Sequence, residues 1–244
     1  MTDTDTTPLP MFYKNPEALS KTAHADLAMQ TSNDYRFAAA ANAIPLMATE
    51  MPQAMRSYPI VFAGDDNMPL ALTGLQQGEN VFVDTDGHWA PGHYIPAYVR
   101  RYPFVLAGDA SDARLTLCID RAASSVTTTA KAAQASPLFK DGEPTDLTQN
   151  AIKFCEEYQT MFNQTKTMVH LIDTHGLLTE QTSKITLPDG ESHTIGGFMG
   201  IDEGKLNSLE DTAFLALRKS GALGAIYCQL GSTNSWQALL NQRG

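Results

Sequence analysis

The sequence predicts an α+β fold: a mostly antiparallel sheet containing two related helix-strand-strand units, with a long helix and a C-terminal helical cap. Three observations lead to this class. One phrase occurs twice, 44 residues apart, and apolar residues recur at helical spacing over about 146–175. Hydrophobic residues also make up 43% of the 244-residue chain, which is enough for a buried core.

The repeated phrase occupies residues 52–65 and 96–109. The two stretches share eight residues without a gap: Pro, Arg, Tyr-Pro, Val and Ala-Gly-Asp. Self-similarity at a fixed spacing marks a repeated supersecondary unit, so we expect an internal duplication over 52–75 and 96–119. We expect the copies either to be neighbours in one antiparallel sheet or to be related by a pseudo-twofold axis.

The elements of the first half follow from local signals. After a loose tail at 1–12, a helix is predicted over 16–29. Thr49 is expected to cap a short helix that ends by Ser57, because the residue before Pro59 is pushed out of the α region. Short runs rich in β-branched and aromatic residues, separated by turn residues, predict the strands. The strands expected are 60–63, 70–75, 81–83, 104–106 and 115–119, with a short helix over 93–101.

The second half is expected to be mainly helical. Residues 122–145, rich in small and polar residues, are interpreted as a connection. The long helix should end at Gly176, a typical left-handed C-cap. A hairpin is expected over 185–195, and Ser208 is expected to cap a helix to about Lys219. Apolar segments at 222–231 and 234–242 then close a single domain over 13–244, whose helical part is 146–244.

The charge balance excludes several classes of partner. The net charge is −10 and the pI about 4.9, which opposes binding to nucleic acid and to anionic membranes. No stretch is long and apolar enough to insert in a membrane, and the first residues do not resemble a secretory signal. We expect a cytoplasmic protein, with signal-independent export left open. A homodimer is also left open.

A set of short phrases spread over residues 11–240 resembles the bacterial SapC family. The phrases are Met11-Phe-Tyr-Lys-Asn15, Tyr58-Pro-Ile-Val-Phe62, Asn80-Val-Phe-Val-Asp84, Tyr102-Pro-Phe-Val-Leu106, Leu115-Thr-Leu-Cys-Ile-Asp120, Leu187-Pro-Asp-Gly190, Gly197-Phe198, Asp202-Glu203, Lys205-Leu206, Ser220-Gly-Ala-Leu223 and Ile226-Tyr227. The resemblance implies a link to surface-layer (S-layer) proteins of the envelope. It also implies genes encoded near those of halogenase-like proteins and outer-membrane receptors, as is usual for relatives. The resemblance supplies no catalytic residues.

The residues themselves point to one candidate ligand site. Arg56 and Arg100 each stand two residues before a Tyr-Pro, and converging guanidinium groups would bind a carboxylate or phosphate. The alternative is that each arginine pairs locally or caps its own helix. Aromatic residues at the rim would complete a groove for a peptide or small molecule. The proposed ligand-binding residues are Arg56, Tyr58, Trp89, His93, Arg100 and Tyr102.

The motifs of common enzymes are missing from the sequence. There is no nucleophile elbow, P-loop or dinucleotide fingerprint, and Cys118, Cys155 and Cys228 lie in apolar segments typical of core thiols. We therefore predict a non-enzymatic binding or accessory protein without a cofactor. One alternative is a metal-dependent enzyme with ligands from His88, His93, Asp84 and Asp86, and the other is a structural surface-layer component.

Overall fold

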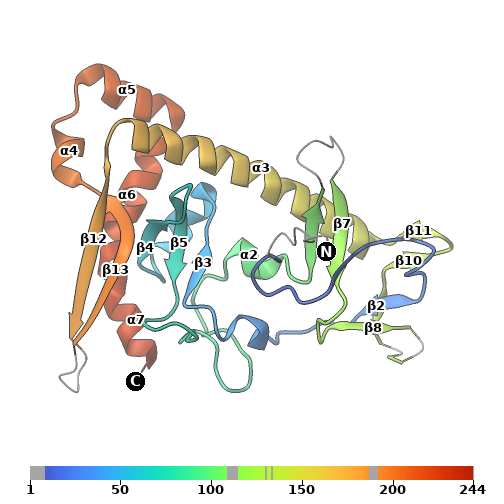
Figure 1. The fold of residues 1–244 in the computed structure, drawn as a ribbon. Helices are drawn as coiled ribbons and strands as arrows, with labels where there is room; N and C mark the ends of the chain where they lie inside the picture. Colours follow the sequence, from blue (N-terminus) through green and yellow to red (C-terminus); the bar gives the residue numbers. More distant parts are fainter. Residues whose placement is uncertain (1–8, 109–114, 130, 133, 187–191, 244) are drawn as a thin grey trace, which may run out of the picture. The chain divides into compact units, whose positions relative to one another are not determined.

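The computed structural model describes residues 9–108, 115–129, 131–132, 134–186 and 192–243, and it confirms the α+β class (Figure 1). The predicted tail at 1–12 lies largely outside the described residues. The chain forms two compact units. The first unit comprises Met1–Ser32 and Arg101–Gln159, and the second comprises Asn33–Arg100 and Thr160–Gly244.

The first unit is built on two small antiparallel sheets. In one sheet the order is β1 (Pro16–Ala18), β7 (Thr116–Asp120) and β6 (Phe104–Ala107); in the other it is β8 (Val126–Thr128), β2 (Leu27–Met29) and β9 (Ser136–Pro137). The short strands β10 (Phe139–Lys140) and β11 (Glu143–Pro144) pair with each other. The apolar side chains of Leu27, Phe104, Ile119 and Leu138 pack together with Cys155, which comes from the first turns of α3 (Asp146–Thr174).

The helix predicted over 16–29 is wrong. That segment instead contributes two strands, with Glu17 opposite Ile119 in one sheet and Met29 opposite Val126 in the other. The segment has no apolar stripe at helical spacing, so pairing with distant strands decides its conformation. The predicted connection over 122–145 also contains the four short strands β8 to β11.

The second unit contains a five-stranded antiparallel sheet. Its order is β12 (Leu178–Thr186), β13 (Ser192–Ile201), β4 (Ile60–Ala63), β5 (Met68–Leu72) and β3 (Ala43–Pro45). The strand predicted at 60–63 is confirmed, and the hairpin predicted over 185–195 is the end of a longer one whose turn lies outside the described residues. The strand predicted at 81–83 is wrong, because Val83 makes only an isolated bridge to Trp89.

Helix α6 (Ala222–Ser232) packs against the sheet where β13 and β4 meet, and Figure 1 shows it beside both strands. The two strands share a single residue pair, Met199 with Phe62. The buried side chain of Gln229 bridges them: its Oε1 accepts from the Ile201 N–H at 3.1 Å, and its Nε2 donates to the Ile60 carbonyl at 3.2 Å. An α6 amide thus satisfies backbone groups that the ladder leaves unpaired.

The other helices are short, and two predicted caps are wrong. Thr49 does not cap a helix: the side chain that reaches back to the start of this turn is Glu50, whose Oε2 accepts from the Met47 N–H at 2.8 Å. The cap of α5 is Glu210, not Ser208, because Ser208 ends a helix that the sequence pattern did not predict. These helices are η1 (Arg36–Ala38), η2 (Ala48–Glu50), α1 (Met51–Ala54), α2 (Ala97–Arg100), α4 (Glu203–Asn207), α5 (Asp211–Ser220), η3 (Thr233–Ser235) and α7 (Trp236–Arg243).

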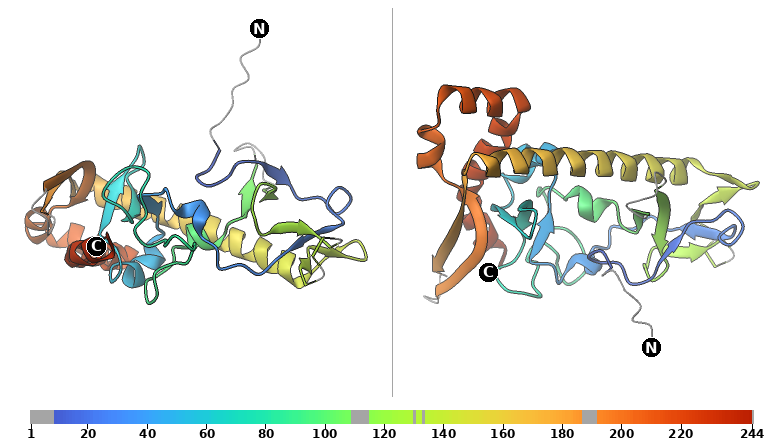
Figure 2. Two further views of the ribbon diagram at one scale, coloured as in Figure 1. Left: turned by 90° about the horizontal axis from the view of Figure 1, so that it is seen from below. Right: turned by 45° about the horizontal axis from the view of Figure 1, so that its top comes forward.

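The predicted long helix is confirmed as α3, which the right view of Figure 2 shows as one uninterrupted helix. Gly176 follows it with φ +67°, as a left-handed C-cap requires. Among the described residues, no helix has the length and apolar character needed to cross a bilayer.

The two copies of the repeated phrase show the same order of elements: α1, β4 and β5 in the first copy, and α2, β6 and β7 in the second. Their strands lie in different sheets, so the expectation that they are neighbours in one sheet is wrong. The strands of the first copy belong to the second unit, and those of the second copy to the first unit.

Candidate functional site

Tyr58 and Trp89, both predicted to bind the ligand, are buried against each other in the second unit. Tyr58 is 0% exposed and Trp89 7%. The Trp89 Nε1–H donates to the Tyr58 hydroxyl at 3.0 Å, and that hydroxyl donates in turn to the Tyr94 carbonyl. The Tyr58 ring meets Phe82 edge to face at 4.7 Å. Burial raises the pKa of Tyr58 well above its ordinary range, so its hydroxyl stays a donor. Through these hydrogen bonds, Tyr58 and Trp89 support the loop that contains Tyr94.

Tyr94 is held from its other end by the buried carboxylate of Glu50. The Tyr94 hydroxyl donates to Glu50 Oε1 at 2.8 Å, and the Ala97 N–H at the start of α2 donates to the same oxygen at 2.6 Å. Arg100 donates through Nη2 to the Tyr94 hydroxyl at 3.1 Å and through Nε to the Ile95 carbonyl at 3.0 Å. Burial, reinforced by the Glu50 charge, raises the pKa of Tyr94 to about 12. Arg100 therefore positions Tyr94.

Beside Tyr94 lies a polar hollow of about 450 Å³, here named the Arg56 hollow. Two of the predicted ligand-binding residues, Arg56 and His93, line it, and no acidic side chain of the described residues does. The exposed Arg56 guanidinium makes no ion pair or side-chain hydrogen bond with any described residue. The hollow is lined by Pro52, Gln53, Arg56, Ser57, Gly92, His93 and Tyr94.

The His93 ring forms one wall of this hollow. It stands edge to face against Phe82 at 5.0 Å, and its Nε2 lies 3.2 Å from the Gln242 amide nitrogen. Its Nδ1 is buried and has no hydrogen-bond partner among the described residues. Burial lowers the pKa of His93, which favours the neutral imidazole near pH 7. The wall is thus polar but uncharged.

Tyr102, the last of the six predicted residues, lies in the first unit. Its hydroxyl donates to Asp120 Oδ2 at 3.2 Å, and its ring packs edge to face on Tyr13 at 5.3 Å. The 0% exposed carboxylate of Asp120 also accepts from the backbone N–H groups of Lys14, Asn15 and Ala122 at 2.9 to 3.0 Å. Tyr102 therefore helps to anchor the N-terminal segment on β7.

Lowering the pH is expected to destabilise the protein through Asp120. Burial by itself raises the pKa of this group, but the three N–H donors and Tyr102 outweigh it, so the folded pKa is lowered. The stabilisation is complete above the ordinary aspartate pKa of about 3.9 and is lost as the pH falls through the lower folded value. Asp120→Asn should remove this part of the acid sensitivity and cost about 2 kcal/mol at neutral pH.

Urea unfolding at several pH values checks this prediction, with the exposed Asp26 changed to Asn as the matched control. Parallel stability–pH curves for wild type and Asp120→Asn would contradict it.

The loop from Asp84 to His88, the alternative metal site, is a turn stabilised from within. The His88 N–H donates to Asp84 Oδ1 at 2.8 Å, and this bond is the main cause of a lowered pKa of Asp84. The His88 ring lies 3.6 Å from the same carboxylate. In the part of the chain that the structure describes, no three or more His, Cys, Asp or Glu side chains are grouped to hold a metal ion.

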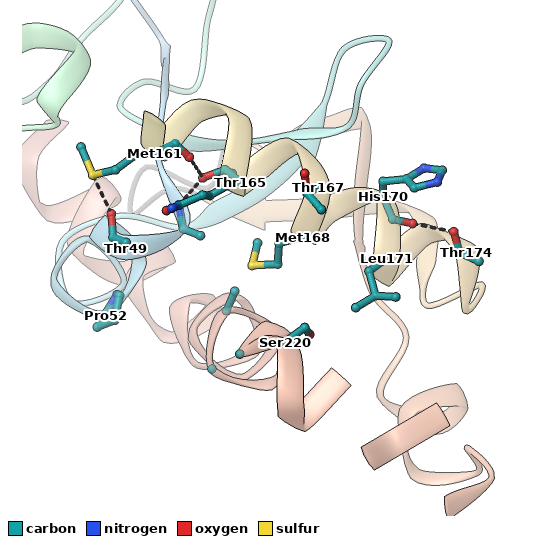
Figure 3. Close-up of a pocket in the computed structure, with 15 residues that line it drawn as sticks. Thr49, Pro52, Met161, Thr165, Thr167, Met168, His170, Leu171, Thr174 and Ser220 are labelled. Carbon is teal, nitrogen blue, oxygen red and sulfur yellow. Dashed lines mark hydrogen bonds between the residues drawn. The ribbon is translucent and has the colours of Figure 1, made fainter. Parts of the chain in front are cut away.

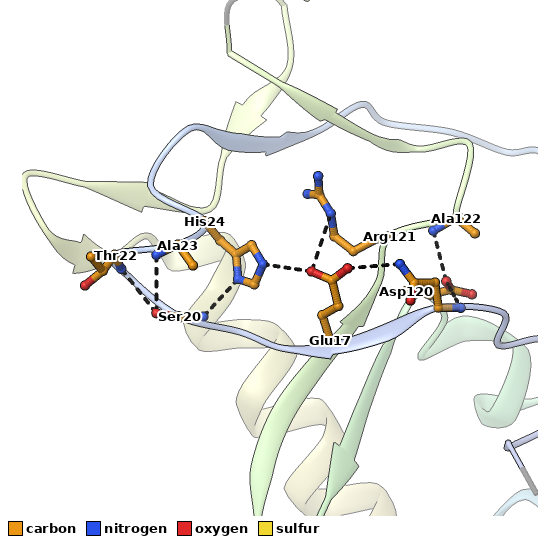
Figure 4. A network of polar contacts seen from close by, with 9 residues as sticks. Glu17, Ser20, Thr22, Ala23, His24, Asp120, Arg121 and Ala122 are labelled. Carbon is orange, nitrogen blue, oxygen red and sulfur yellow. Dashed lines mark hydrogen bonds and ion pairs between the residues drawn. The ribbon is translucent and has the colours of Figure 1, made fainter. Parts of the chain in front are cut away.

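A Ser-His-Glu cluster in the first unit does not have the geometry of a catalytic triad (Figure 4). His24 Nε2 lies 3.2 Å from Glu17 Oε2, but its Nδ1 accepts from the backbone N–H of Ser20 at 3.1 Å. The Ser20 hydroxyl oxygen instead accepts from the N–H groups of Thr22 and Ala23. Arg121 Nε approaches the same Glu17 oxygen at 4.0 Å. The cluster therefore fixes the loop between β1 and β2.

The cysteines are unsuited to nucleophilic work. Cys118 and Cys155 are buried and Cys228 is half-buried. Burial raises the pKa of Cys155 to about 11 and shifts the other two in the same direction. Thiols with such pKa values stay protonated near pH 7 and react slowly.

The fold and the hollow define an α+β protein with an open polar cavity, which two of the predicted ligand-binding residues, Arg56 and His93, line. The chain belongs to the SapC family, whose model matches residues 19–239. No curated protein and no solved structure matches the chain.

Proposed function

We propose that this SapC-family protein is a non-enzymatic binding or accessory protein, and that the Arg56 hollow receives a carboxylate of a peptide or small molecule. The observation that carries the proposal is the Arg56 guanidinium, which has no partner among the described residues and faces a hollow without acidic lining. A guanidinium binds a carboxylate through two parallel hydrogen bonds, which gives direction as well as charge.

The walls of the hollow support binding because they are held in place. Tyr94 is fixed at its hydroxyl by Glu50 and Arg100, at its carbonyl by Tyr58, and at its N–H by the Ser57 hydroxyl at 3.1 Å. A site held in this way loses little conformational freedom on binding. In this proposal Arg56 and His93 contact the ligand, whereas Tyr58, Trp89 and Arg100 position Tyr94, and Tyr102 has no part in the site.

The proposed partners come from the envelope or nutrient-uptake machinery, or from halogenase-like systems. This assignment is supported by the family resemblance alone. The hollow adds only the requirement that the recognised group be an anion small enough for about 450 Å³.

Arg56→Ala is expected to weaken carboxylate binding at least about tenfold, because a charged hydrogen bond contributes about 1.5–3 kcal/mol. Acetate and succinate can be titrated at constant ionic strength into ¹⁵N-labelled protein. Shifts are expected at the amides of Gly92, His93 and Tyr94 in the wild type, and much weaker ones in the variant.

The matched control is Arg218→Ala, which removes an exposed arginine of α5 and the same unit of charge. Equal titrations of wild type and Arg56→Ala would remove the basis of the proposed function. A loss of binding in Arg218→Ala as large as in Arg56→Ala would show that net charge, not the hollow, attracts the anion.

A further inference from the structure

A second cavity, here named the α3 pocket, lies within the second unit and has a volume of about 840 Å³. Residues of α3 from Met161 to Thr174 form one wall. The segment from Ala48 to Pro52 and the α5–α6 junction from Ser220 to Ala225 form the others (Figure 3). Its volume falls in the range of small-molecule sites, roughly 300–1,000 Å³. It shares only Pro52 with the Arg56 hollow.

The lining of the α3 pocket has no carboxylate, ammonium or guanidinium group. None of its 15 residues is Asp, Glu, Lys or Arg. In Figure 3, Met168 and Leu171 reach from α3 toward the other walls, whereas the His170 imidazole points away from them. An ionised occupant would lose hydration here without gaining a carboxylate, lysine or arginine as a charged partner, which is costly.

The hydroxyl groups of the lining are already engaged, so the pocket is less polar than its sequence suggests. Thr165, Thr167 and Thr174 each donate to the carbonyl four residues earlier in α3, at 2.7 to 3.0 Å. Ser220 donates to the Leu217 carbonyl at 2.9 Å, and Thr49 to the Met161 sulfur at 3.1 Å. The pocket therefore offers an occupant mainly methyl, methylene and thioether surface.

Two polar side chains of the lining keep free hydrogen-bonding capacity. Gln164 and His170 have no side-chain hydrogen bond among the described residues. Because the His170 imidazole points away from the other walls, Gln164 is the group that could orient a polar end of a ligand. Small-molecule sites commonly combine a mostly apolar wall with a few polar groups of this kind.

The opposite wall owes its space to glycine. A Cβ placed on Gly224, in the first turn of α6, would meet no atom within 4 Å. Met161 and Met168 line the same pocket, and methionine side chains adapt to occupants of different shape. The pocket is thus open at its α6 wall and adaptable in shape at its α3 wall.

We propose that the α3 pocket is a second binding site, for an uncharged small molecule with an apolar body and one polar end group. The absence of carboxylate, ammonium and guanidinium groups from the lining selects against ions, and the occupied hydroxyls leave apolar contact as the main attraction. Gln164 would hydrogen-bond the polar end.

Fluorescence titration with the neutral dye Nile red tests this proposal. Gly224→Leu should weaken dye binding at least about tenfold, because its side chain occupies the pocket and leucine suits a helix. The matched control Gly224→Ala adds one carbon and should bind nearly as the wild type. A second variant, Met168→Gln, keeps the length of the side chain and should bind several-fold more weakly; circular dichroism verifies the fold of each.

Competition then tests the ligand class. At about pH 8, where a carboxylic acid is ionised, 1-decanol should displace Nile red at concentrations about tenfold lower than decanoate. The proposal is overturned if the wild type shows no saturable dye binding, if Gly224→Leu binds as the wild type does, or if decanoate competes as well as decanol. Arg56→Ala should leave dye binding unchanged, so this test and that of the Arg56 hollow fail independently.

Discussion

Glu50→Ala is expected to lower the free energy of unfolding by about 3 kcal/mol. The carboxylate is 5% exposed and accepts three hydrogen bonds, from the N–H groups of Met47 and Ala97 and from the Tyr94 hydroxyl. The variant leaves all three donors without their acceptor, at the junction of η2, α1 and α2. Tyr94 also loses the group that fixes its position beside the Arg56 hollow.

Urea unfolding followed by circular dichroism measures this effect. Glu180→Ala is the matched control, because Glu180 is exposed in β12 and should change stability by less than about 0.5 kcal/mol. Glu50→Gln should fall between the two, since an amide keeps one acceptor oxygen but turns an N–H group toward a backbone donor. A loss below about 1 kcal/mol in Glu50→Ala would mean that water replaces the carboxylate at little cost.

Gln229→Leu should lower the free energy of unfolding by about 2–4 kcal/mol. Leucine has nearly the volume of glutamine but cannot accept from the Ile201 N–H or donate to the Ile60 carbonyl. Both backbone groups lie under α6, where water does not reach them easily, so the cost of leaving them unpaired is high.

A local measurement separates this mechanism from a general loss of packing. Hydrogen exchange at the Ile201 amide should accelerate more in Gln229→Leu than exchange at amides of β5. The control is Gln237→Leu, which makes the same change at an exposed position of α7 and loses only a bond to Asn241. If both variants unfold at the same urea concentration, Gln229 does not bridge the strands energetically.

Local sequence signals correctly predict those elements whose conformation is set by residues near to them in the chain. The helix at Asp146–Thr174 has apolar residues at helical spacing and a glycine at its end, and the strand at Ile60–Ala63 follows a Tyr-Pro that stops a helix. The segment 16–29 has no such signal, because its partners in β7 and β8 lie about a hundred residues away. Distant pairing of this kind leaves no periodic trace in the sequence.

The candidate site was predicted in part. Arg56 and His93 line one hollow, but Tyr58 and Trp89 are buried because their polar atoms bond each other, which makes aromatic burial inexpensive. No local sequence signal marks Glu50 as the residue that holds Tyr94, since its three donors come from separate segments. The α3 pocket was missed because no single stretch of sequence contains its walls.

Each of the two units is built from two separate segments of the chain, and this limits how the protein can be cut into fragments. The chain passes from one unit to the other at 32–33, at 100–101 and within α3 at 159–160, so neither unit is a continuous stretch. A single backbone cut at 100–101 would give two fragments, each carrying strands of both units. The halves of such a nicked protein would be held together by the β13–β4 pairing in one unit and the β1–β7 pairing in the other. Separate expression of residues 1–100 and 101–244 is therefore a route to reassembly of the whole protein from two pieces, and not to the isolation of either unit.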